Sequence, residues 1–242
     1  MKKIFAPLVS ALFPDRCAYC GVPIASGSLA CEKCAHSLPR ISGEICPKCG
    51  REKENCSCKK AEMYFERLAA PFYFSGVVRT GIHAFKFRKS PDNYRAYSSE
   101  TAKTVRERYG GVHFDYITEV PMTAKSVKDR GYNQCALLAK GIAEELGIEY
   151  KAGVLKKIYE TEKQHGLSYY LRKGNLTGAF DVADAESVKD KTVLLCDDIS
   201  TTGETLNECS KMLWLYGAKE IYCVTTALTK SKLTEKQSDN KT

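Results

Sequence analysis

The residues best suited to chemistry lie in a thirteen-residue stretch from Val193 to Thr205. Its first four residues are apolar and predict a buried strand, and the adjacent acids Asp197 and Asp198 follow. A polar run then precedes a helical pattern, and its members are Thr201, Thr202, Gly203, Glu204 and Thr205. The carboxyl end of a parallel strand, where a helix begins, is where α/β proteins bind ligands.

Each part of this stretch suits a different part of a ribose 5-phosphate. Free backbone N–H groups and the positive end of a helix dipole at residues 201–205 would bind a phosphate. The carboxylates of Asp197 and Asp198 would accept hydrogen bonds from sugar hydroxyls or bind a divalent cation. A strand end with an Asx-type turn and a hydroxyl-rich helix cap is the alternative, but it does not explain paired acids and hydroxyls together.

Eight of the twelve cysteines lie before residue 59, in four short-range pairs. Such a pair puts two thiolates on one turn, and two turns complete a tetrahedral four-cysteine zinc site. The simplest assignment is sequential, with one zinc ion on Cys17, Cys20, Cys31 and Cys34 and the other on Cys46, Cys49, Cys56 and Cys58. Cross-braced pairing, an iron–sulfur cluster and a disulfide framework are the alternatives. The last is disfavoured because the chain has no convincing export signal.

The remaining four cysteines fall in helix-like or strand-like contexts. They are Cys135, Cys196, Cys209 and Cys223. We expect them to be core residues.

Positive charge concentrates in one part of the chain. The formal net charge is +8. Eight zinc-bound thiolates with two zinc ions would neutralise the excess positive charge of the cysteine-rich region. Residues 79–115 then stand out, with eight Lys and Arg against four Asp and Glu. Arg79 and Lys86 share a helical face there, close to Phe85 and Phe87. The pattern predicts either a surface that binds single-stranded DNA or an ordinary solvated basic face.

Strands that alternate with helices organise the rest of the chain. Strands are expected at residues 66–76, 115–121, 192–196 and 221–227, and helices at 77–88, 93–109, 134–146 and 203–216. This alternation is typical of a parallel sheet flanked by helices in an α/β fold. The expected organisation is a small zinc-ribbon module over residues 1–60, an α/β domain over 61–229 and a polar tail over 230–242.

Two polar segments are expected to be loops beside the phosphate-binding stretch. Residues 122–134 carry Lys128 and Arg130, which would hold pyrophosphate oxygens. The polar segment from Tyr159 to Phe180, within residues 153–182, is long enough to form a lid that excludes water from a reactive centre. The expected lid residues are Gln164, Ser168, Arg172 and Asn175.

The chain contains no apolar run of the roughly 20 residues that a spanning helix needs. Its first fourteen residues superficially resemble a signal peptide, but Pro7 interrupts the apolar run and Pro14 ends it. We therefore expect a short amphipathic helix that packs on the protein, and a cytoplasmic location.

Several motifs together resemble a known family. The stretch 193–205 resembles the signature of type I phosphoribosyltransferases, which bind 5-phosphoribosyl 1-pyrophosphate (PRPP) with magnesium, and departs from it at Ser200. With the eight cysteines, Asp-Arg-Gly-Tyr-Asn-Gln at 129–134 and Gln-x2-Leu-Ser-x3-Arg-x2-Asn-Leu-x-Gly-Ala-Phe at 164–180, the chain is similar to the ComF competence-protein family. The similarity extends over residues 13–227.

The resemblance implies both a fold and a role. Members join a zinc ribbon to a type I phosphoribosyltransferase domain and are associated with uptake or processing of single-stranded DNA in natural transformation, beside a helicase-like partner. It implies catalytic roles for Asp197, Asp198 and Arg172, and PRPP contacts from residues 201–205, Lys128 and Arg130. Two classes stay open: a transferase with an unidentified acceptor, and a non-catalytic module that senses PRPP.

Overall fold

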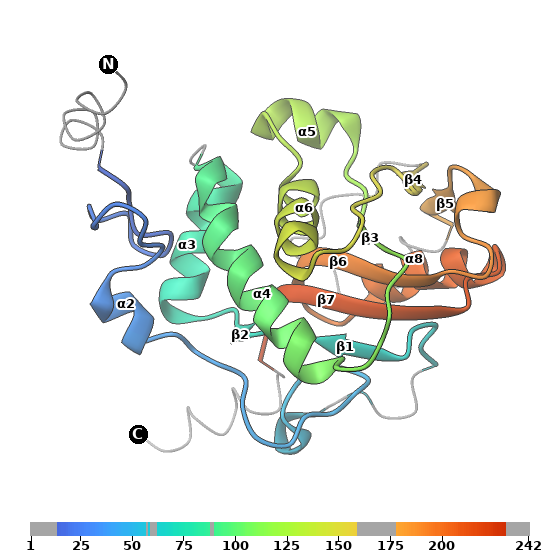
Figure 1. The fold of residues 1–242 in the computed structure, drawn as a ribbon, viewed down its shortest axis with the longest axis horizontal. Helices are drawn as coiled ribbons and strands as arrows, with labels where there is room; N and C mark the ends of the chain where they lie inside the picture. Colours follow the sequence, from blue (N-terminus) through green and yellow to red (C-terminus); the bar gives the residue numbers. More distant parts are fainter. Residues whose placement is uncertain (1–13, 57, 59–61, 88–89, 159–177, 231–242) are drawn as a thin grey trace.

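A parallel β-sheet forms the centre of the protein (Figure 1). The computed structural model describes residues 14–56, 58, 62–87, 90–158 and 178–230. Its sheet contains β1 (Arg67–Ala69), β2 (Phe72–Tyr73), β3 (Tyr116–Glu119), β6 (Thr192–Ser200) and β7 (Glu220–Leu228). The order is β1-β7-β6-β3, and β2 also pairs with β7. All these pairings are parallel, as the alternation of strands and helices predicts.

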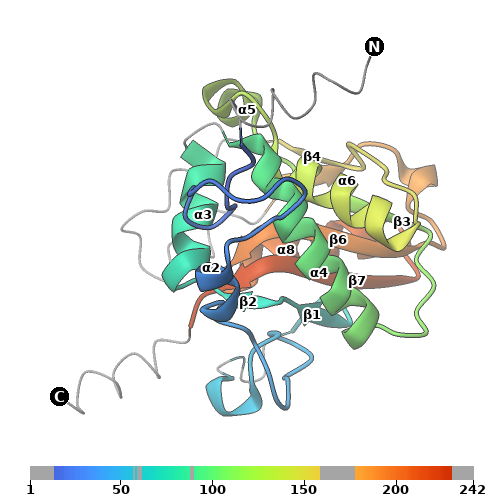
Figure 2. The same ribbon diagram turned by 60° about the vertical axis from the view of Figure 1, so that its left-hand side comes forward.

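Helices cover both faces of this sheet. α3 (Gly76–Phe87), α4 (Tyr94–Arg108) and α6 (Gln134–Leu146) lie on one face, and α8 (Glu204–Leu215) lies on the other (Figures 1 and 2). Each face buries its own apolar cluster, with Ile82, Tyr97 and Leu138 on the first and Leu206 and Leu213 on the second. β6 and β7 contribute to both clusters, which explains their nearly continuous apolar sequences.

Short helices complete the described structure. They are α2 (Glu32–His36), α5 (Ala124–Arg130) and the 3₁₀ turns Lys53–Asn55, Pro91–Asn93 and Ala185–Ser187. None of the helices in the described ranges is long and apolar enough to cross a membrane.

Two strands differ in extent from the sequence expectation. The strand expected at residues 66–76 is two short strands, because Pro71 lies between them and has no N–H to donate to the sheet. The strand expected to end at Cys196 continues to Ser200, which pairs with Leu228. The two acids therefore lie within β6 and not beyond its end.

The segment 122–134 is partly helical, although a loop was expected. Thr123 caps α5 by accepting a hydrogen bond from the backbone N–H of Ser126 at 3.2 Å. Gly131 ends α5 in the left-handed conformation, with φ of 84°. Asn133 then caps α6, since its side chain accepts from the N–H of Cys135 at 3.0 Å. The sequence therefore contained both a capping residue and a terminating glycine for α5, Thr123 and Gly131.

A small antiparallel sheet lies at the two ends of the expected lid. It consists of β4 (Leu155–Lys157) and β5 (Phe180–Val182), and it pairs Lys157 with Phe180. Neither strand was expected from the sequence. The lid residues Gln164, Ser168, Arg172 and Asn175 lie outside the described residues.

The two halves of the cysteine-rich region pack against different parts of the domain. In the first half, the carbonyl of Ala18 accepts hydrogen bonds from Tyr97 and Asn93, both at 3.0 Å. Gly81 of α3 permits this approach, because a Cβ there would lie 2.5 Å from the same oxygen. The second half lies beside β1, where the carbonyl of Pro47 accepts from the backbone N–H of Leu68 at 2.8 Å.

Candidate functional site

Asp198 is held by side chains from two helices. It is 6% exposed, and Lys86 Nζ of α3 lies 2.8 Å from its Oδ1. Gln134 Nε2 of α6 donates to its Oδ2 at 2.8 Å. Both carboxylate oxygens therefore have a partner, and the ammonium group compensates the buried charge.

The neighbouring acid, Asp197, forms no ion pair with any of the described residues. Its Oδ1 accepts from the backbone N–H of Asp198 at 2.8 Å and lies 3.4 Å from the thiol of Cys135. Burial, and then the negative charge of Asp198, raise the pKa of Asp197 to about 7. A divalent cation or a sugar hydroxyl beside Asp197 would stabilise its ionised form.

Lys86 corrects one expectation from the sequence. Its side chain is 17% exposed and paired with Asp198, so Lys86 belongs to the acid site and not to a solvated basic face. Phe85 is 1% exposed and belongs to the core, so it does not contribute to a surface that binds DNA. Phe87 is the aromatic residue of this helix end that solvent reaches, with 64% exposure.

The residues 201–205, here called the phosphate loop, form a small polar pocket beside Asp197. Ile199, Ser200 and Leu206 complete its lining. Gly203 is the N-cap of α8 with φ of 85°, and no side chain caps the helix. The first backbone N–H groups of α8 therefore remain available to a ligand, and their dipole favours an anion.

Six buried side-chain atoms lack hydrogen-bond partners in the described structure, and two of them are acceptors at this site. These two are Gln134 Oε1, on the amide that donates to Asp198, and Glu204 Oε1, within the phosphate loop. Buried polar atoms are normally hydrogen-bonded, so unpaired atoms near a pocket point to a ligand that supplies donors. The donor and acceptor set therefore fits a phosphorylated sugar with its hydroxyls and a cation.

The two basic residues expected to bind pyrophosphate lie on α5. Lys128 is exposed. Arg130 is half-buried, with its guanidinium carbon 5.5 Å from the centre of the Phe87 ring. Phe87 is the last residue of α3, so the guanidinium of Arg130 contacts the end of that helix and not the phosphate loop.

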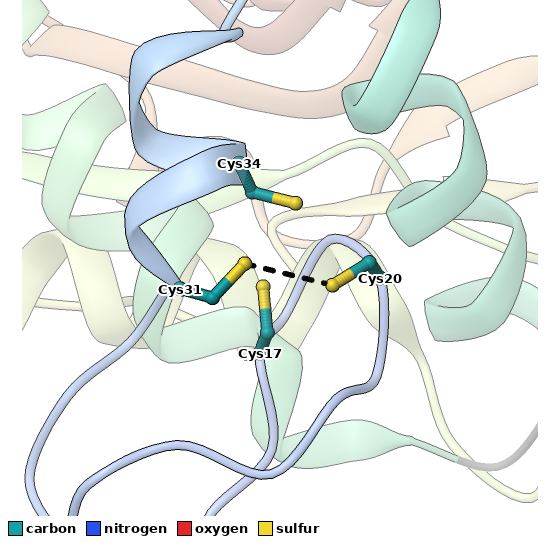
Figure 3. Close-up of side chains that lie close together, drawn as sticks. All are labelled: Cys17, Cys20, Cys31 and Cys34. Carbon is teal, nitrogen blue, oxygen red and sulfur yellow. Dashed lines mark hydrogen bonds between the residues drawn. The ribbon is translucent and has the colours of Figure 1, made fainter.

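The first four cysteines form a compact cluster (Figure 3). Cys17 and Cys20 come from one turn, and Cys31 and Cys34 come from the start of α2. The sulfurs of Cys20 and Cys31 are 3.7 Å apart. Tetrahedral Zn–S bonds of about 2.3 Å place two sulfurs about 3.8 Å apart. A disulfide would require about 2.05 Å, so the cluster fits a zinc ion.

The other four cysteines of the region form the second cluster. They are Cys46, Cys49, Cys56 and Cys58. The sulfurs of Cys46 and Cys58 lie 3.5 Å apart. The eight cysteines therefore group in sequence order and not in the cross-braced arrangement, and the two clusters support two structural zinc ions.

Three residues at the acids and the phosphate loop were missing from the expected site. Gln134 ends the motif at 129–134 but was assigned no role, and Lys86 was expected on a helical face that either binds single-stranded DNA or is simply solvated. Arg51, from the second zinc-ribbon half, donates to the carbonyl of Thr201 at 2.5 Å. No local sequence signal indicates this last contact, because 150 residues separate its partners.

Comparisons with known proteins agree with this architecture. A double zinc ribbon domain model matches residues 8–64, and a phosphoribosyl transferase domain model matches residues 133–242. Competence protein F of Haemophilus influenzae is 30% identical over 222 residues, which cover 86% of this chain and 95% of that protein. DNA utilization protein YhgH of Salmonella typhimurium is 28% identical over 227 residues, covering 89% and 98%.

A third relative is more distant. Competence protein ComFC of Bacillus subtilis is 24% identical over 196 residues, which cover 76% of this chain and 77% of that protein. With a double zinc ribbon, a phosphoribosyltransferase domain and this full-length similarity, the chain belongs to the competence protein F (ComF) family.

Proposed function

We propose that the α/β domain binds PRPP together with Mg²⁺ at the acids of β6 and the phosphate loop. The observation that carries the proposal is the acid Asp197, which has no ion pair among the described residues, beside an uncapped helix N-terminus. The 5-phosphate would accept hydrogen bonds from the backbone of residues 202–205. Asp197 and Asp198 would accept from the ribose hydroxyls, and Mg²⁺ would neutralise charge on the pyrophosphate.

This site serves either of two roles in the proposal. In a transferase, a nucleophile would displace pyrophosphate from the ribose C1, and Lys128 and Arg130 of α5 would bind the departing pyrophosphate. In a sensor, PRPP binds without turnover and reports the supply of nucleotide precursors. Release of pyrophosphate from PRPP in the presence of a panel of nucleobases distinguishes the two.

Gly203→Ala is expected to weaken PRPP binding by about tenfold or more. The positive φ of Gly203 strains any side chain, and relief of that strain moves the amides that hold the phosphate. Titration calorimetry with PRPP and Mg²⁺ measures the effect.

Gly217→Ala is the matched control for this change. Gly217 follows the other end of α8, has φ of 86° and has no atom within 3.7 Å of an added Cβ, so the backbone strain is comparable. Its PRPP affinity should equal that of the wild type. Equal affinity in all three proteins would place the phosphate elsewhere.

We also propose that the exposed face of α3 binds single-stranded DNA, in keeping with relatives named for competence and DNA utilization. Arg79, Thr80, His83 and Phe87 line a surface groove there. The rings of Phe74, His83 and Phe87 form a row with centroids 6.0 and 5.8 Å apart. Exposed rings beside a guanidinium suit stacked bases and a phosphate backbone.

Phe87→Ala combined with Arg79→Gln is expected to weaken binding of an oligothymidylate by about tenfold, the effect of losing one stacked base. Loss of Arg79 should also flatten the log–log salt dependence by about 0.7. Fluorescence anisotropy at several salt concentrations measures both quantities.

Trp214→Ala is the control, because Trp214 is an aromatic residue with 56% exposure on α8, the opposite face of the sheet. It should bind DNA like the wild type. Unchanged affinity in the double variant would move DNA binding to the zinc ribbons or to a partner protein.

A further inference from the structure

Arg51 joins the second zinc-ribbon half to the phosphate loop. Its Nη2 donates to the carbonyl of Thr201 at 2.5 Å, and its Nε donates to the carbonyl of Thr229 at 2.9 Å. The residue is 5% exposed. Thr229 follows β7, and its N–H donates to the carbonyl of Ser200 at 3.1 Å. One guanidinium therefore ties together the ends of the two central strands at the point where the phosphate loop begins.

The turn that carries Arg51 is part of the second four-cysteine cluster. Arg51 lies two residues after Cys49, and its carbonyl accepts from the N–H of Cys46 at 2.8 Å. The N–H of Gly50 donates to the carbonyl of Cys46 at 2.9 Å. Gly50 is also pressed against β1, because an added Cβ would lie 2.8 Å from the carbonyl oxygen of Leu68. A metal ion on Cys46 and Cys49 would hold this turn in the conformation that directs the Arg51 side chain toward the carbonyls of Thr201 and Thr229.

We propose that Arg51 is a positioning residue through which the zinc ion of the second cluster sets the conformation of the phosphate loop. The effect on ligand affinity rests on the proposed PRPP site, whereas the effect on the loop itself does not. Among the described residues, the guanidinium donates to the backbone carbonyls of Thr201 and Thr229, so it acts by orienting the amides of residues 202–205 and not by contacting the ligand.

Hydrogen exchange of the full-length, zinc-loaded protein tests the positioning role without any ligand. Arg51→Gln is expected to speed exchange of the amides of residues 202–207 by about tenfold relative to those of α6, because two charge-assisted hydrogen bonds are lost. Arg51→Lys keeps the charge but cannot reach both carbonyls, so it should restore part of the protection. Loop exchange equal to the wild type in Arg51→Gln overturns the proposal.

Arg40→Gln is the control within the same module. Arg40 pairs with Glu100 of α4 at 2.7 Å and lies over the Phe72 ring, so its loss perturbs the zinc-ribbon packing without touching the phosphate loop. It should leave exchange of residues 202–207 unchanged. A rise in loop exchange as large as that of Arg51→Gln would show that general loosening of the module is the cause, and would overturn the proposal.

The link to zinc is tested by adding a zinc chelator under reducing conditions. In the wild type and in Arg40→Gln, chelation should speed exchange of the loop more than that of α6. In Arg51→Gln, the loop should already exchange fast and respond no further. An equal rise in the loop and in α6 would mean that zinc acts on the whole domain, and would overturn coupling through Arg51.

Calorimetry with Mg²⁺–PRPP then tests the consequence for binding. The dissociation constant of Arg51→Gln should rise about tenfold, while that of Arg40→Gln stays at the wild-type value. If the wild type does not bind PRPP, the proposed function fails, yet the exchange results still decide the positioning role. If PRPP binds with equal affinity to the wild type and to Arg51→Gln, the effect of Arg51 on ligand affinity is overturned.

Discussion

Replacing Asp198 by asparagine is expected to abolish Mg²⁺–PRPP binding and to lower stability, whereas replacing Asp197 is expected to abolish binding without lowering stability. Asp198→Asn removes the counter-ion of Lys86, whose side chain is 17% exposed, and should lower the free energy of unfolding by about 2–3 kcal/mol. Adding Lys86→Met to Asp198→Asn should recover most of that loss, because the unpaired charge is gone. A carboxylate at an exposed strand end could be changed without harm to the fold, but Asp198 is buried.

Asp197→Asn should change stability in the opposite direction. The pKa of Asp197 is raised to about 7, so between pH 4 and pH 7 the folded protein binds more protons at this carboxyl than the unfolded protein does. Stability therefore falls as pH rises through this range. Asparagine does not titrate, so at pH 8 without Mg²⁺ the variant should be about 1 kcal/mol more stable, or about 2–4 °C higher in Tm.

Urea unfolding at pH 5 and pH 8 measures these stabilities, and calorimetry measures the binding. The stability difference between Asp197→Asn and the wild type should shrink toward zero at pH 5, where the wild-type carboxyl is largely protonated. An Asp197→Asn protein that is less stable than the wild type at pH 8 would contradict the charge argument. Unchanged PRPP affinity in both single variants would place the ligand elsewhere.

The fully reduced protein is expected to contain two zinc ions per chain and to lose the fold of residues 15–58 when they are removed. Structural zinc sites of this kind contribute on the order of 10 kcal/mol each, far more than the small apolar core of the module provides. Elemental analysis of freshly purified protein measures the content. A value well below one zinc per chain would reject the zinc assignment.

Two serine variants separate zinc binding from ordinary cysteine burial. Cys49 and Cys209 are both buried, but only Cys49 belongs to a four-cysteine cluster. Cys49→Ser should reduce the content to about one zinc per chain. Cys209→Ser should keep two. Equal zinc content in the two variants would mean that Cys49 is not a ligand.

The features that the sequence determined alone are those whose residues lie close together along the chain. The pairs within the cysteine-rich region, the acid-and-hydroxyl stretch 193–205 and the alternating strands and helices each depend on spacings of a few residues. Local backbone geometry then decides the outcome, as with the left-handed glycine Gly203 before α8. Short or polar elements were missed for the same reason: Lys156 and Lys157 of β4 show no apolar strand pattern.

Tertiary structure alone decided which side chains surround the acids. Lys86 and Gln134 reach Asp198 across 112 and 64 residues, and Arg51 reaches Thr201 across 150. A lysine on an amphipathic helix is expected to be solvent-exposed from its sequence. Only the position of α3 beside β6 shows that Lys86 compensates a buried carboxylate. The burial of Phe85 beside the exposed Phe87 was settled in the same way, because one turn of a helix places neighbouring residues on different faces and packing chooses which face is inside.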